Sequence, residues 1–260
     1  MFMQNLRKAT QKHRKLLIIV VVLLGASMVG TFASWNSNYD ESSSSSDSPS
    51  TAEYIKMYEN LVKEKTPAEG KPVDYGTATT LAQYYKQLNT YYYTAYTENQ
   101  SSDEKLAKEY LTKSTNAITK AAEYYQVAID NALPGLNNLG KAQLYANKAA
   151  ALFGAGTDSQ TVRANYQKAY ELAPDNWDIA YSYSWFILST DGLEKATAFL
   201  TAYKNSLPAD SSTSSTVDQA IQYYKSLYQS VDNTESKNTS TSSNKTDSTS
   251  ASGSSSSSSK

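Results

Sequence analysis

The chain has 260 residues, 40% of them hydrophobic, and its 24 Lys and Arg residues almost balance 25 Asp and Glu residues. The net charge of −1 excludes a bulk electrostatic attraction to nucleic acid. Cysteine is absent and the one histidine, His13, precedes an apolar run, which excludes disulfides, cysteine-type zinc sites and any histidine-based catalysis after residue 13.

The N-terminal segment is typical of a membrane anchor. Residues 16–35 carry no charge, and residues 1–15 include five Lys and Arg side chains. A bilayer core of about 30 Å requires a helix of about 20 apolar residues. We therefore predict a transmembrane helix over residues 16–35, with the basic tail 1–15 in the cytoplasm and the bulk of the chain outside it. A cleavable signal peptide, which would give a secreted protein, is the alternative.

Two other segments have almost no apolar residues that could support a packed core. Residues 36–50 are rich in Ser and are predicted to form a disordered linker. Residues 232–260 are rich in Ser and Thr and are predicted to form a disordered tail. The tail is either low-complexity padding or a segment that is glycosylated or contacts a cell-wall polymer.

Residues 51–231 have the hydrophobic period of α-helices, with apolar side chains three and four positions apart and no sustained strand alternation. Pro134, Pro174 and Pro208 indicate helix ends, and Asp191-Gly192 is typical of a tight turn. This part of the chain is therefore predicted to be an all-α domain. The expected helices cover residues 51–65, 77–98, 102–133, 139–154, 159–173, 176–190, 192–207 and 214–230.

Two stretches of this domain share a 34-residue period. Pro174 and Pro208 occupy matching places in two similar helix endings, "AYELAPD" and "AYKNSLPAD". The apolar positions before each proline correspond as well: Val162, Tyr166 and Ala169 in the first stretch, and Ala196, Leu200 and Tyr203 in the second. The helices before these also match, with the stripe Ala146, Ala149, Ala150 and Phe153 followed by the stripe Ala180, Tyr183, Ser184 and Ile187. The small residues Ala150, Ala169 and Ser184 are expected to let helices approach closely.

This pattern resembles the tetratricopeptide repeat, a helix–turn–helix unit of about 34 residues. The most similar phrases are "QKAYELAPDN" and "DGLEKATAFL", although Ala or Ser replaces the Trp and Gly of the family. Two units match, over residues 143–176 and 177–210. A third unit would be distorted into a long hairpin of the helices at 77–98 and 102–133, and the helix at 214–230 would be the terminal cap. The resemblance implies a repeat solenoid of about three units behind the transmembrane helix.

In this family the first helices of the units line a concave surface that usually holds a peptide or a partner segment. Carried over position by position, the resemblance implies partner contacts from Asn147, Lys148, Ala151, Asp178, Tyr181, Trp185, Gln83 and Lys86. An aromatic pair beside separated polar groups matches the composition of binding hot spots. The alternative is that the rings of Tyr181 and Trp185 pack against the adjacent helix or the C-terminal cap.

An enzyme is not expected. Ser102 and Lys105 have the spacing of a nucleophile pair, but the companion motifs are missing, and a serine at a helix start is a capping residue. Glycine-rich phosphate loops are also absent from the sequence, and we predict no cofactor, metal or small-molecule substrate. The expected function is that of a membrane-tethered extracytoplasmic scaffold for a protein or peptide partner. The alternative is an envelope-associated structural protein whose tail contacts cell-wall polymer, with the helices as a spacer.

Overall fold

The computed structural model describes residues 49–240, and within that range the chain forms eight α-helices and no strand. The predicted all-α class is therefore confirmed for this part of the chain. The helices are α2 (Thr51–Lys65), α3 (Tyr75–Asn99), α4 (Glu104–Asp130), α5 (Asn138–Gly154), α6 (Ser159–Leu172), α7 (Trp177–Asp191), α8 (Leu193–Ser206) and α9 (Thr213–Ser240).

Most helix boundaries lie within two residues of the prediction, and the exceptions have physical causes. The α4 helix ends at Asp130 instead of residue 133. Pro134 disfavours the helical conformation of the residue before it, so the helix ends ahead of that residue. In contrast, α9 continues to Ser240, ten residues beyond its predicted end, and so includes residues 232–240 of the predicted tail. No Gly or Pro occurs between Pro208 and Gly253 to end the helix sterically.

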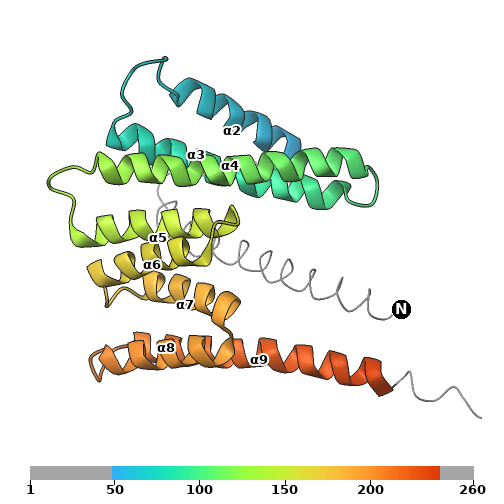
Figure 1. Ribbon diagram of the computed structural model, residues 1–260, viewed down its shortest axis with the longest axis vertical. Coiled ribbons are helices and arrows are strands. Elements are labelled where there is room, and N and C mark those ends of the chain that lie inside the picture. Colours follow the sequence, from blue (N-terminus) through green and yellow to red (C-terminus); the bar gives the residue numbers. More distant parts are fainter. Residues whose placement is uncertain (1–48, 241–260) are drawn as a thin grey trace, which may run out of the picture.

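The helices are stacked along the long axis of the molecule, with α2 at one end and α9 at the other (Figure 1). Each helix packs against the next in sequence, and from α5 onwards helices two apart also touch. The rings of Phe153 on α5 and Phe186 on α7 meet edge to face with centroids 5.5 Å apart, and Tyr170 on α6 meets Phe199 on α8 at 5.4 Å. Ring contacts therefore join α5 to α7 and α6 to α8.

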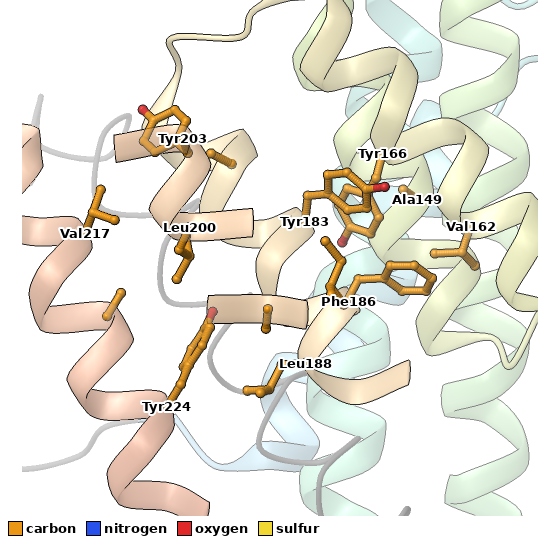
Figure 2. Close-up of a cluster of buried hydrophobic side chains, with 14 residues drawn as sticks. Ala149, Val162, Tyr166, Tyr183, Phe186, Leu188, Leu200, Tyr203, Val217 and Tyr224 are labelled. Carbon is orange, nitrogen blue, oxygen red and sulfur yellow. The ribbon is translucent and has the colours of Figure 1, made fainter. Parts of the chain in front are cut away.

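The largest core lies between α5 and α9 and contains most of the positions that showed the 34-residue period, whereas Ala169 packs in a smaller cluster beside it. Tyr166 and Tyr183 stack with ring centroids 5.5 Å apart in the middle of this core (Figure 2). The helices α6 and α8 each have 14 residues, and both their first and their last residues are 34 positions apart. Ala169 and Ser184 are fully buried, as expected for close helix approach, whereas Ala150 is partly exposed.

The turn between α7 and α8 consists of Gly192 alone, as the Asp191-Gly192 pair predicted. Its φ of 95° lies in a region that side chains with a Cβ rarely adopt, so glycine is required there. The Asp191 carboxylate also accepts a hydrogen bond of 2.8 Å from Arg163 on α6. The turn thus fixes α8 against α7 with little freedom.

The helices α3 and α4 form a long antiparallel hairpin, as predicted. Its interior is mostly alanine and tyrosine, but one buried polar pair interrupts it. The Asn89 side chain donates to the backbone carbonyl of Ser114 at 3.1 Å and to its hydroxyl at 2.8 Å, and that hydroxyl lies 3.2 Å from the Asn89 carbonyl. Because a shift of either helix would break these bonds together, they fix the register of the hairpin.

The expected anchor over residues 16–35 and the basic tail 1–15 lie outside the described residues, as do most of the linker and residues 241–260. Within residues 49–240, no helix combines the length and the hydropathy that a bilayer span requires. Ser50, the last residue of the predicted linker, has a structural role: its hydroxyl and the Glu53 carboxylate cap α2 reciprocally.

Candidate partner-binding surface

The two expected contact residues on α3 have different environments. Gln83 is exposed, whereas Lys86 is partly buried, and burial lowers the pKa of its ammonium group. No hydrogen bond or ion pair links the Lys86 ammonium to another residue between 49 and 240. Lys86 is the only basic residue of α3, and Glu98 is its only acidic residue.

The expected residues on α5 lie close to α4. Asn147 is partly exposed, and the Lys148 ammonium donates a hydrogen bond to the Gln126 side chain on α4. Burial lowers the pKa of Lys148, and the Asp130 carboxylate at the end of α4 opposes that shift. Ala151 is only 1% exposed, so it is part of the core and is not available to a partner. The implied partner contact at Ala151 is therefore wrong in this structure, because the α3–α4 hairpin already covers that position.

On α7, the expected aromatic residues are partly exposed and also contact α9. The ring of Tyr181 lies 5.1 Å from Trp177 and 6.2 Å from Trp185, centroid to centroid. Trp185 in turn lies 4.9 Å from Tyr224 and 6.1 Å from Tyr223. These contacts form a continuous aromatic row from the start of α7 to α9. Burial raises the pKa of the Tyr181 hydroxyl, which therefore stays neutral in the physiological range.

One strip of α7 stays partly open to solvent, with only Trp185 packed against another helix, α9. It consists of Asp178, Ser182, Trp185 and Ser189, which recur at four- and three-residue spacing and so share one helix face. Asp178 is exposed and the other three residues are partly exposed. We call these four residues the open strip of α7.

The residues 34 positions before the open strip have the opposite environment. They are Leu144, Lys148, Ala151 and Ala155 on and just after α5. Leu144 and Ala151 are buried, and Ala155 packs beside them, in one cluster with the α3–α4 hairpin. Lys148 is bonded to α4, as described above. The strip of α5 is therefore covered by the hairpin, whereas on the strip of α7 only Trp185 packs against another helix, α9.

Charge also distinguishes the two strips. On α5, the cation Lys148 lies near the Asp130 carboxylate of the helix that covers it. On α7, the charged residue is the anion Asp178, with which no Lys or Arg in the described part of the chain forms an ion pair. Asp178 lies in the first turn of α7, where the helix dipole favours a negative charge. It is free to meet a cation from outside.

Comparison of the chain with protein-family models, with curated proteins and with solved structures gave no match. A function for this chain is therefore inferred from its own geometry. Ser102 lies in the turn before α4, and its neighbour Asp103 takes the capping position instead, accepting a 2.9 Å hydrogen bond from the Leu106 amide. Between residues 49 and 240, no group of His, Asp and Glu side chains could hold a metal ion.

From the sequence, packing of Tyr181 and Trp185 against the C-terminal cap was named only as an alternative, and Tyr223 on α9 was missed. Tyr223, with 45% of its surface exposed, extends the aromatic row beyond α7. The Tyr-Tyr pair at 223–224 was a usable signal, because adjacent residues of an amphipathic helix point in different directions and Tyr224 was already assigned to the apolar side.

Proposed function

We propose that this chain is a membrane-tethered, extracytoplasmic scaffold that binds a protein or peptide partner on α7 and α9. In this proposal its helix pairs are tetratricopeptide-like repeats, stacked behind an N-terminal transmembrane helix. The 34-residue offset between α6 and α8 supports the repeats, and the apolar run at residues 16–35 supports the anchor.

The observation that carries the proposal is the open strip of α7 together with the exposed ring of Tyr223. Protein interfaces are enriched in Trp and Tyr and are depleted of charge at their centre. The aromatic row has that composition, since Trp177, Tyr181, Trp185 and Tyr223 adjoin one another and Asp178 lies at the edge. Aromatic rings left partly in water beside polar side chains are suited to a partner that buries them.

The test is quantitative cross-linking of the full-length chain in its native membrane. Tyr223→Ala should reduce cross-linking to the partner at least tenfold, since truncating an aromatic anchor typically costs about 2 kcal/mol of binding. Leu133→Ala is the matched control, because Leu133 is also an exposed apolar side chain, at 56%, but lies in the connection between α4 and α5. Equal loss in both variants, or no loss in either, would refute the proposal.

A second function is favoured by the shape of the stack. The chain enters at α2 and leaves at α9, and these helices lie at opposite ends of the long axis (Figure 1). A protein held in a membrane at one end could present a Ser/Thr-rich tail to an envelope polymer at the other. Deleting residues 241–260 separates the two functions. If the truncated protein is no longer retained in the envelope but still cross-links to its partner, the spacer function is supported.

A further inference from the structure

Within this chain, the packing of the α3–α4 hairpin on α5 shows how another helix can cover a strip at the same repeat positions as the open strip of α7. The strip of α5 is covered by the hairpin through packing of Leu144 and Ala151 against its alanine-rich face and through the bond from Lys148 to Gln126. The covering element is thus helical and offers small apolar residues with a polar, anionic edge. The open strip of α7 has the same helical spacing but carries Trp185 in place of alanine and an anion in place of leucine.

We infer that the partner binds the open strip of α7 as an amphipathic α-helix that carries a Lys or Arg opposite Asp178. This inference rests on the proposed function and specifies the chemistry of the partner. The partner helix would lie beside α7 as the hairpin lies beside α5. Its apolar stripe would contact the rings of Trp185 and Tyr181.

The charge of the partner follows from the charge of the strip. Asp178 is exposed and has no cation beside it among the described residues, and α7 contains no Lys or Arg at all. A basic side chain on the partner can pair with this carboxylate and lie over the neighbouring aromatic faces, which attract cations. An acidic helix would instead bring like charges together, which is unfavourable at an interface.

The partner's secondary structure follows from the strip's geometry. Ser182 and Ser189 are small, and they alternate along the strip with the larger Asp178 and Trp185. A surface with ridges and gaps at helical spacing is complementary to the side-chain ridges of another helix. The strip also lies along a single helix, so one partner helix running beside α7 can contact Asp178, Ser182 and the part of the Trp185 ring that α9 leaves exposed.

The inference is tested with a display library of single amphipathic helices, selected against the full-length protein in detergent. Selected peptides are synthesised, their bound conformation is measured by NMR, and their affinity is measured by fluorescence anisotropy. We expect helical peptides with Lys or Arg beside the apolar stripe. Asp178→Asn should weaken them about fivefold, the upper range for an exposed ion pair. Glu194→Gln is the matched control, since Glu194 is also an exposed acid in the first turn of a helix, on α8.

A charge exchange gives the sharpest test. Asp178→Lys should abolish binding of the selected basic peptides, and replacing their basic residue by Glu should restore it. Peptides that bind in an extended form, or whose binding ignores Asp178 but is lost in Tyr223→Ala, would overturn the inference and leave the proposed function intact. Peptides insensitive to both positions, or a library with no binder, would overturn both. Self-association that Asp178→Lys abolishes would identify a second copy as the occupant and also overturn it.

Discussion

The side-chain oxygens of Ser184 on α7 and Tyr224 on α9 lie 2.8 Å apart, and neither residue exposes surface to solvent. The Ser184 hydroxyl also lies 2.7 Å from the Tyr181 carbonyl and can donate to it. The Tyr224 hydroxyl depends on Ser184 for its hydrogen bond. This asymmetry predicts that the two residues respond differently to substitution.

Ser184→Ala should lower the free energy of unfolding by about 1–3 kcal/mol, because it leaves the Tyr224 hydroxyl buried without a partner. Tyr224→Phe should cost less, because Ser184 can still bond to the Tyr181 carbonyl. Urea denaturation of both single variants and of the double variant measures the coupling. A larger loss in Tyr224→Phe than in Ser184→Ala would contradict this account of the pair.

Ala169→Leu should destabilise the fold by about 1–3 kcal/mol through overpacking. Ala169 is fully buried and packs with Ala142, Ala173 and Ile179 at the junction of α5, α6 and α7. The control is Ala164→Leu on the exposed side of α6, which should change the melting temperature little. Equal melting curves for both variants would show that the α5–α6 junction tolerates a larger side chain.

Asn89→Ala should lower the free energy of unfolding by about 1–3 kcal/mol, because the Ser114 hydroxyl loses its donor partner inside the hairpin. It should also speed amide hydrogen exchange in α3 and α4 more than in α7 and α8, since the two regions contribute to different core clusters. Asn116→Ala, at an exposed position on α4, is the control. Uniform exchange changes along the stack would argue against a local effect.

The fold should lose stability as the pH rises from about 10 to about 12. Burial, the nearby Tyr170 and the carboxylates of Asp175 and Asp178 raise the pKa of Tyr203 to about 12. A hydroxyl with a raised pKa in the folded state stabilises the fold fully below its unfolded pKa of 10.0, and this contribution is lost as the pH rises towards the folded value.

Alkaline titration monitored by tyrosinate absorbance and by circular dichroism tests this. Tyr203→Phe should make the decline in stability with pH less steep, because one group fewer releases its proton on unfolding. At neutral pH the same variant should be slightly less stable, because the hydroxyl donates a 2.9 Å hydrogen bond to the Asp175 carbonyl. An unchanged slope would show that Tyr203 ionises freely in the folded protein.

The local features of the fold were predictable because they depend on residues close in sequence. Pro174 and Asn176 place the start of α7, and Gly192 places its end. For Trp185 the sequence left two environments open, a partner surface or packing against the C-terminal cap, because no short-range pattern specifies where α9 crosses α7. The burial of Ala151 was missed for the same reason. The sequence indicated a long hairpin, but not that the hairpin would cover the strip of α5 that the resemblance assigned to a partner.

The stack has a mechanical consequence if the chain is held at both ends. Because α2 and α9 lie at opposite ends of the long axis, tension applied through residues 50 and 240 would pass through the helix interfaces one after another (Figure 1). In such a series the weakest interface gives way first. An end helix is held from one side only, and α2 is such a helix, with Ile55 and Tyr58 as its buried residues. Peeling α2 away would lengthen the molecule while the core around α7 stays folded, so the protein would act as an extensible tether whose binding surface survives the first extension.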